Sequence, residues 1–276
     1  MINLPLAFIP PAGAILTMLM LATPVQSSDA VTAATAPVSQ PATAVAAATV
    51  SADQAMQQAA KDGRYALLCF WQGNSAETQT FRKGFAEAAA KEGHRAVAIE
   101  VQADAQANAE LIRRLQLDRA PRPLALAFAP NGAVTRGFQQ FPAEGFAGVF
   151  VGPSLAACLK VTQEGKLAVI GFANAKTKDG EATLTAAKAF LAEDAVKSIA
   201  ALVTVDPAVP ADSDLCQALK IAPDTNVSMV ALLVPPGRMI GLFSAPVTKE
   251  QLLAALAKAS SGGCGPGHGC GPSGCP

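Results

Sequence analysis

The last thirteen residues of the chain hold its densest group of side chains that can do chemistry. The segment "SSGGCGPGHGCGPSGCP" places Cys264, His268, Cys270 and Cys275 among glycine, proline and serine residues. Three thiols and one imidazole form a complete tetrahedral donor set for a soft or borderline cation such as zinc or copper(I). The spacings between them match neither a zinc ribbon or finger nor the Cys-x-x-Cys-His of haem attachment.

The composition of this tail limits what a metal site there would be. Ordering a glycine-rich backbone costs about 1–2 kcal/mol per residue, and the tail has no apolar side chains whose burial would offset that cost. A bound metal is therefore expected to exchange readily. Two other interpretations stay open: the thiols of an exported protein form one disulfide and leave one cysteine to link with a partner, or the tail has no function.

The other three cysteines, Cys69, Cys158 and Cys216, are separated from one another and lie within apolar segments. Isolated cysteines in such settings behave as small buried hydrophobic residues. We therefore expect no chemistry from them.

The overall composition excludes some partners. The chain has 276 residues, half of them apolar, which is enough for a sizeable core. Its formal net charge is zero, and only 15% of the residues are charged. Such a chain has no electrostatic surface for nucleic acid or for an anionic membrane, so nucleic-acid binding is not expected.

The first fifty residues have the pattern of an export signal followed by a spacer. Residues 4–22 are largely apolar and small or polar residues follow, which predicts a signal peptide over residues 1–28. Pro10 and Pro11 interrupt this segment, so a cleaved signal is favoured over a membrane anchor. Contact with a membrane is then expected only through an uncleaved signal, and the mature protein is expected in the periplasm or outside the cell. Residues 29–50 are rich in Ala, Thr and Pro and predict a flexible linker.

The body of the chain contains an internal repeat. "KDGRYALLCF" (61–70) aligns without a gap with "QEGKLAVIGF" (163–172) at an offset of 102, and "LALAFAPNGAVTRGF" (124–138) aligns with "MVALLVPPGRMIGLF" (229–243) at an offset of 105. Two such matches in the same order indicate a tandem duplication. It predicts one domain over residues 51–152, a second over 153–259, and a Gly/Cys-rich tail over 260–276.

Each copy is expected to contain, in order, a helix, a strand, a helix, a strand, a helix, two strands and a final helix. Alternating strands and helices that end in a hairpin predict an α/β fold, with a mixed sheet flanked by helices on both faces. The expected segments are 52–61, 65–71, 76–91, 94–101, 107–117, 124–128 and 133–138 in the first copy, and 155–162, 167–172, 182–191, 199–205, 215–221, 229–234, 239–243 and 249–259 in the second.

The first copy resembles the thioredoxin family. A buried strand ends in Phe70-Trp71, a loop and a long helix follow, and Pro123 stands directly before an apolar strand that leads to an Asn131-Gly132 hairpin. The resemblance covers roughly residues 51–259 and implies two consecutive thioredoxin-like domains. It places the two cysteines of the family's Cys-x-x-Cys loop on Ser75 and Thr78, and the family's cis-proline on Pro123, next to Arg122.

Neither Ser75 nor Thr78 can form a disulfide, so the resemblance implies that the first domain has no dithiol. In the second copy the corresponding positions are Thr177, Gly180 and, in place of the proline, Ser228. Both thioredoxin-type sites are therefore expected to be inactive.

The sequence gives less support to other roles for the residues of these sites. A nucleophilic Ser75 would need a base, and the chain has only His94 and His268. An N-cap for the following helix is the favoured role of Ser75. Arg122 and its neighbour Arg119 can present an anion- or peptide-binding edge, but solvated surface charge is favoured, and Trp71 is expected in the core.

Two classes of function follow. The favoured one is an exported, non-catalytic binding or scaffold protein with a metal- or thiol-reactive tail, whose partner is a protein or a metal ion. The alternative is a thiol-disulfide oxidoreductase that works through the tail cysteines.

Overall fold

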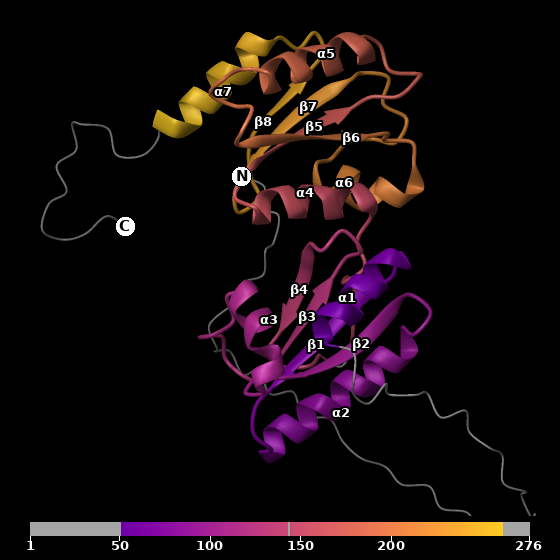
Figure 1. Ribbon diagram of the computed structural model, residues 1–276. Helices are drawn as coiled ribbons and strands as arrows, with labels where there is room; N and C mark the ends of the chain where they lie inside the picture. The colour runs from indigo at the N-terminus through magenta and orange to yellow at the C-terminus, as the bar shows by residue number, and fades with distance from the viewer. Residues whose placement is uncertain (1–50, 143, 262–276) are drawn as a thin grey trace, which may run out of the picture.

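The structure is a computed structural model that describes residues 51–142 and 144–261. The expected signal peptide and linker, and the four tail residues expected to bind metal, lie outside the described residues. The described chain forms two successive halves, each built on a four-stranded sheet with helices on both faces (Figure 1). Among the described residues, no helix combines the length and apolar character needed to cross a membrane.

The first half contains four strands and three α-helices. Its sheet has the order β2-β1-β3-β4, in which β1 and β2 are parallel and the other two pairs are antiparallel. The elements are α1 (Ala52–Lys61), β1 (Tyr65–Trp71), α2 (Ala76–Lys91), β2 (Ala96–Gln102), the 3-10 helix η1 (Gln106–Asn108), α3 (Ala109–Arg114), β3 (Leu124–Phe128) and β4 (Val134–Phe138).

The second half repeats this plan. Its sheet has the order β6-β5-β7-β8, with the same parallel and antiparallel pairs. The elements are α4 (Pro153–Gln163), β5 (Leu167–Phe172), α5 (Gly180–Leu191), β6 (Ala200–Val205), the 3-10 helix η2 (Pro210–Asp212), α6 (Ser213–Ala218), β7 (Met229–Val234), β8 (Arg238–Ser244) and α7 (Lys249–Ser261).

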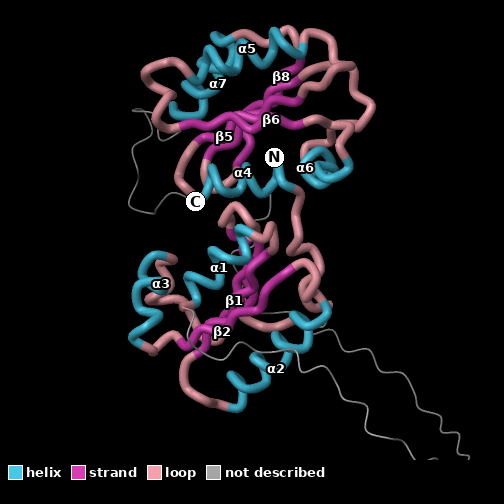
Figure 2. Tube along the Cα trace, turned by 45° about the vertical axis from the view of Figure 1, so that its right-hand side comes forward, coloured by secondary structure: helices cyan, strands magenta, loops and turns pink. Residues whose placement is uncertain are grey.

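Alternation along the central strands divides each core into two layers. In β1, Leu67 and Cys69 face α2, whereas Leu68 and Phe70 face α1 and α3. In the second half, one side of the sheet packs against α4 and α6 and the other against α5 and α7. Figure 2 shows these helices on opposite sides of the upper sheet. The two halves therefore share one architecture, as the internal repeat predicts.

The expected final helix of the first copy is absent from the described residues, and this prediction is wrong. A turn over residues 144–148 occupies its place beside α2. Phe141 and Phe146 stack edge-on at 5.1 Å, and both rings pack against Phe85 of α2. Gly145 adopts a φ of 68°, a left-handed conformation that would interrupt a helix. Aromatic packing thus covers the face of the sheet that α7 covers in the second half.

The expected helices 107–117 and 215–221 have other bounds in the structure: both end earlier than expected, at Arg114 and Ala218, and the second also starts earlier. Each begins as a 3-10 turn and ends as a short α-helix, α3 or α6. Just beyond them, Gln116 and Lys220 have φ values of 56° and 58°, which lie in the left-handed region and terminate a right-handed helix. The two copies therefore stop these helices in the same way.

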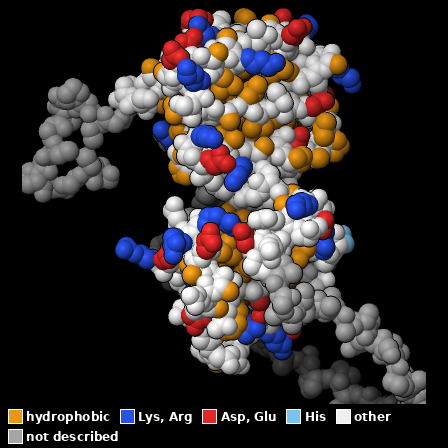
Figure 3. Space-filling model, in the orientation of Figure 1, with side chains coloured by type: hydrophobic (Ala, Val, Ile, Leu, Met, Phe, Trp, Pro, Cys, Tyr) orange, Lys and Arg blue, Asp and Glu red, His pale blue; other side chains and the backbone are white. Residues whose placement is uncertain are grey.

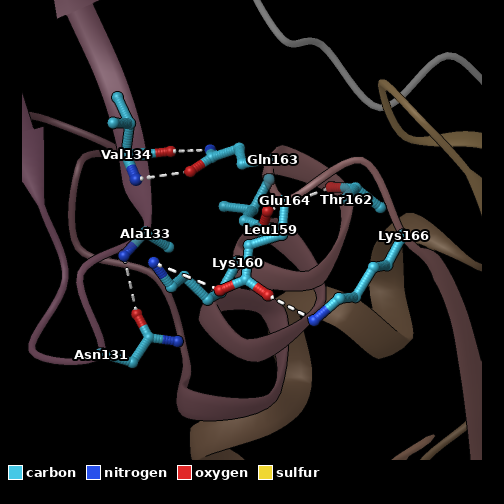
Figure 4. A network of polar contacts seen from close by, with 9 residues as sticks. All are labelled: Asn131, Ala133, Val134, Leu159, Lys160, Thr162, Gln163, Glu164 and Lys166. Atoms are coloured by element: carbon cyan, nitrogen blue, oxygen red, sulfur yellow. Dashed lines mark hydrogen bonds and ion pairs between the residues drawn. The ribbon is translucent and has the colours of Figure 1, made fainter. Parts of the chain in front are cut away.

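The two halves are joined by a short linker with specific contacts. The Tyr65 hydroxyl donates to the Val151 carbonyl at 2.7 Å and accepts from the Val151 N–H at 3.0 Å. The side-chain amide of Gln163 on α4 pairs with both backbone groups of Val134 on β4, at 2.9 and 2.6 Å (Figure 4). Gly152 donates its N–H to Asp214 at 2.7 Å. The linker is therefore held by hydrogen bonds to both domains.

Candidate functional site

The N-terminus of α2 contains the two positions where the resemblance places the missing dithiol. Ser75 is the N-cap residue, and its hydroxyl accepts a hydrogen bond from the Thr78 N–H at 3.1 Å. The hydroxyl oxygens of Ser75 and Thr78 lie 3.0 Å apart and share a second hydrogen bond. Thr78 is buried. The pair therefore stabilises the start of a helix, as capping chemistry requires.

No histidine lies near Ser75 among the described residues. Ser75 follows the carboxyl end of β1, whereas His94 precedes the amino end of β2, and the two strands are parallel. His94 is therefore at the opposite end of the sheet. The described structure gives Ser75 no base that would activate it as a nucleophile.

A charged group covers the tryptophan that precedes this loop. The Arg82 guanidinium lies 4.2 Å from the centroid of the half-buried Trp71 ring, a cation–π contact. The Nε atom of Arg82 donates to the Glu100 carboxylate at 3.1 Å. Sequence reasoning did not find Arg82 or Glu100. The one sign of this contact in the sequence is Glu100, a carboxylate within the otherwise apolar residues 96–101 of β2.

The loop before β3 has the expected proline but does not present Arg122 as a free charge. The Arg122–Pro123 peptide bond is cis. The Arg122 guanidinium donates to the carbonyls of Ala120 at 3.1 Å and Leu117 at 2.9 Å. Burial lowers the pKa of Arg122 from its ordinary value. Arg122 therefore holds its own loop together, while Arg119 is exposed.

At the corresponding position of the second domain, side-chain hydroxyls and backbone groups bond to one another. α5 begins at Gly180, after a left-handed Asp179 with a φ of 56°. The buried Ser228 hydroxyl donates to the Lys178 carbonyl at 2.9 Å and lies 2.8 Å from the Thr183 hydroxyl. The segment around Lys178 also forms a bridge to Val227. Hydroxyls and backbone thus fill the place of a thiol and a proline.

The loop before α5 is held by its own polar groups. The Thr177 hydroxyl donates to the Asn174 carbonyl at 2.8 Å, and the Asn174 side chain donates to Asp206 at 2.8 Å. The hydrogen bond from Asn174 is the main reason that the pKa of Asp206 is below its usual value. These contacts fix the conformation of the loop.

The three cysteines of the described chain are free and buried. Burial, with a smaller contribution from Glu100, raises the pKa of Cys69 to about 12. Burial also raises the pKa of Cys158 to about 12, and that of Cys216 rises for the same reason. Since the thiolate is the reactive form, burial and a raised pKa lower the reactivity of these thiols at neutral pH. They pack as small hydrophobic residues, as their sequence context predicts.

The predicted metal ligands, Cys264, His268, Cys270 and Cys275, lie outside the described residues. Within residues 51–142 and 144–261, no three His, Cys, Asp or Glu side chains are grouped so as to hold a metal ion. A metal site therefore stays a prediction about the tail.

Together, these features define the fold of the protein. Each half has a central pair of parallel strands, a long helix between them, and an antiparallel hairpin that completes the sheet. The first half also has the cis-proline directly before its third strand. Both halves therefore have a thioredoxin-like fold, and the positions at which the resemblance places the dithiols hold no cysteine.

Comparison with known proteins gives matches in structure alone. No family model matches the chain, and no curated protein matches it. Thioredoxin Deadhead of Drosophila melanogaster is 18% identical, with 34% of this chain and 86% of that chain covered and a TM-score of 0.28. The first two thioredoxin domains of Saccharomyces cerevisiae Eps1p are 11% identical, with 73% and 94% covered and a TM-score of 0.26. Human ERp44 is 13% identical, with 74% and 54% covered and a TM-score of 0.31. Nothing about the activity of this chain follows from likenesses this low.

Proposed function

We propose that this chain is an exported, non-catalytic binding or scaffold protein, in which two thioredoxin-like domains form the body and the Cys/His tail captures a soft metal ion or forms thiol links. The observation that carries the proposal is the hydrogen-bonded hydroxyl pair of Ser75 and Thr78 at the α2 N-terminus. A helix N-terminus is where a thiolate would be activated, and here it is occupied by a helix cap.

The body cysteines support the same proposal. With a pKa raised to about 12, the Cys69 thiol is protonated at pH 7. The same holds for Cys158. Such thiols neither attack a disulfide nor bind a metal at a useful rate. Any thiol chemistry of this protein is then assigned to Cys264, Cys270 and Cys275.

The donor set of the tail favours zinc or copper(I), because thiolates select soft or borderline cations. Glycine-rich flanks make such a site labile, which suits capture or transfer of a metal better than a structural role. In the oxidising compartment implied by the apolar N-terminal segment, the same three thiols form one disulfide and leave one thiol for a partner protein.

The second candidate is a thiol-disulfide oxidoreductase whose working cysteines are in the tail. The observation that favours it is that half of the six cysteines are in the last thirteen residues, in a glycine-rich segment that can reach a client. This candidate needs two tail thiols to cycle with a client disulfide, whereas the scaffold proposal needs none to do so.

Insulin reduction separates the two candidates. The full chain and its Cys264→Ser/Cys270→Ser/Cys275→Ser variant are compared with dithiothreitol as the electron donor. The scaffold proposal predicts the background rate for both proteins. A rate above background that disappears in the triple variant would refute it and establish the oxidoreductase.

Metal capture is tested separately by intact mass spectrometry of protein from the exported fraction, with and without chelator. The proposal predicts a mature N-terminus after the signal segment, together with either a chelator-sensitive metal adduct or a disulfide in the tail. Protein that retains its first residues and carries three reduced, metal-free tail thiols would contradict it.

A further inference from the structure

β6 is the last strand on one side of the second sheet, and half of its backbone groups have no partner. β6 pairs only with β5. Hydrogen bonds from Leu167 to the Ile199 carbonyl and from Ala173 to the Val205 carbonyl show that the odd-numbered residues face β5. Because backbone direction alternates along a strand, Ala200, Leu202 and Thr204 direct their N–H and C=O groups away from the sheet. Within the described residues, no hydrogen bond reaches these groups.

The first domain protects its two outer strands, whereas the edge of β6 is open. On β2, the equivalent of β6, the Arg64 guanidinium donates to the Ala96 carbonyl at 2.6 Å, and Glu100 places a charge on the strand. On β4, the amide of Gln163 occupies both backbone groups of Val134. Charges and side-chain hydrogen bonds of this kind prevent another strand from pairing. β6 has neither.

The side chains of β6 allow a second strand to approach. The strand reads Ala-Ala-Leu-Val-Thr-Val and contains no charged residue. Ile199, directly before it, is 47% exposed, the largest exposed fraction among the large hydrophobic residues of the described chain. Hydrophobic side chains also gather on the face of the second domain shown in Figure 3. An uncharged outer strand with an exposed apolar residue at its start is a feature by which sheets associate.

We propose that β6 pairs in antiparallel orientation with β6 of a second copy of this chain, about a two-fold axis at Leu202. In this register Leu202 lies opposite Leu202 of the second copy, and Ala200 lies opposite Thr204 of the second copy. Each of these pairs exchanges two N–H···O bonds, which gives about six in all. The two four-stranded sheets become one continuous sheet. The proposal is independent of the function of the tail.

Charge at the two ends of the strand favours a second copy over an unrelated partner. Lys197 lies just before β6 and Asp206 just after it. An antiparallel pairing of β6 with itself brings Lys197 of each chain near Asp206 of the other, twice by symmetry. The present ion partner of Lys197 is Asp194, which is 94% exposed and so holds Lys197 weakly. A parallel pairing would instead place like charges together.

Sedimentation of the full chain tests the association. The proposal predicts a concentration-dependent dimer of about 56 kDa, twice the 28.0 kDa of one chain. Lys197→Glu removes two attractive end contacts and adds repulsion, so it is expected to weaken dimerisation about 2- to 30-fold. Lys83→Glu, at a 79% exposed lysine on α2 of the other domain, is the matched control and is expected to have no effect. A wild-type chain that stays monomeric at 100 µM (about 10⁻⁴ M, well above a specific Kd) overturns the proposal.

Hydrogen exchange identifies the surface. In the dimer, the amides of Ala200, Leu202 and Thr204 are expected to be protected, and dilution to the monomer is expected to remove this protection. Thr204→Pro deletes one edge donor and blocks pairing, whereas Thr204→Val keeps the donor; an outer strand tolerates proline where its N–H faces solvent. Circular dichroism verifies that each variant is folded. If Thr204→Pro does not fold, Lys197→Glu tests the interface instead. A dimer whose three amides exchange freely would show a different interface and overturn the proposal.

Discussion

Returning two thiols to the N-terminus of α2 is expected to recreate a disulfide there. The hydroxyl oxygens of Ser75 and Thr78 are 3.0 Å apart, and a disulfide places its sulfur atoms about 2.05 Å apart on longer bonds to carbon. In Ser75→Cys/Thr78→Cys the two sulfur atoms therefore need little backbone movement to bond. Closing a loop of about four residues is worth about 2 kcal/mol of stability in the chain-entropy relation. The helix N-terminus further favours the thiolate over the thiol.

The assay uses this double variant in a chain that also carries Cys264→Ser, Cys270→Ser and Cys275→Ser, so that the tail cannot pair with the new thiols. Intact mass after treatment with oxidised glutathione is expected to fall by about 2 Da, the two hydrogens lost when one disulfide forms. Ser75→Cys alone is the control and is expected to form no internal disulfide. Two thiols that stay free in the folded double variant would refute the view that the loop keeps a thioredoxin-type geometry without its sulfur.

Three further results are expected from the described contacts. Ser75→Ala removes the cap of α2 and should lower the free energy of unfolding by about 1 kcal/mol. The control Thr80→Ala removes a hydrogen bond of a hydroxyl group inside the same helix and should change the free energy of unfolding by less than about 0.5 kcal/mol. Equal effects of the two substitutions in urea unfolding would contradict the cap. Gly152→Ala should destabilise the folded protein by about 1–3 kcal/mol, because the new Cβ would lie 1.9 Å from the Ala211 carbonyl oxygen. The control Gly165→Ala has open space around its Cβ but a φ of 76°, so it should lose about 1–2 kcal/mol from backbone strain alone. Unchanged stability of Gly152→Ala would show that the linker is not packed as described. The hydrogen bond with Arg114 lowers the pKa of Asp53. The ion pair therefore stabilises the folded state above the unfolded pKa of about 3.9, and this stabilisation is lost as the pH falls through the lower pKa of the folded state. The difference in unfolding free energy between wild type and Asp53→Asn should be small and constant at neutral pH and shrink below about pH 4, and a difference that grows on acidification would contradict the ion pair.

Much of the fold follows from the sequence because the central strands are marked strongly. Apolar runs that begin two residues after Gly63 and Gly165 predict β1 and β5, and their bounds match the structure. The Asn131-Gly132 turn likewise predicts the β3–β4 hairpin, with Gly132 at a φ of 81°. Local composition determines these elements, so one sequence is enough to find them.

The predictions that failed did so for physical reasons that the residue pattern of the sequence does not show. The expected final helix of the first copy does not form, because Pro142, Gly145 and three phenylalanines favour a packed turn there. The start of α5 was expected at residue 182 and lies at Gly180. Periodicity could not place this start, because the loop before it is fixed by tertiary contacts such as that of Lys178 with Val227.

The candidate site was predictable in its residues but not in its contacts. The absence of cysteine at positions 75 and 78 is plain in the sequence, and the cap role of Ser75 follows from residue type. The Arg82 contact with Trp71 and the clamp of Arg122 on its own loop depend on distances across the fold. No spacing rule gives those distances.

The most direct test of the central claim is a thiol titration of the folded, reduced and metal-free chain. The account predicts that the three tail thiols react rapidly with a maleimide at pH 7, and that Cys69, Cys158 and Cys216 react only after unfolding, because burial raises the pKa of each. Rapid labelling of any of these three cysteines in the native protein would contradict it.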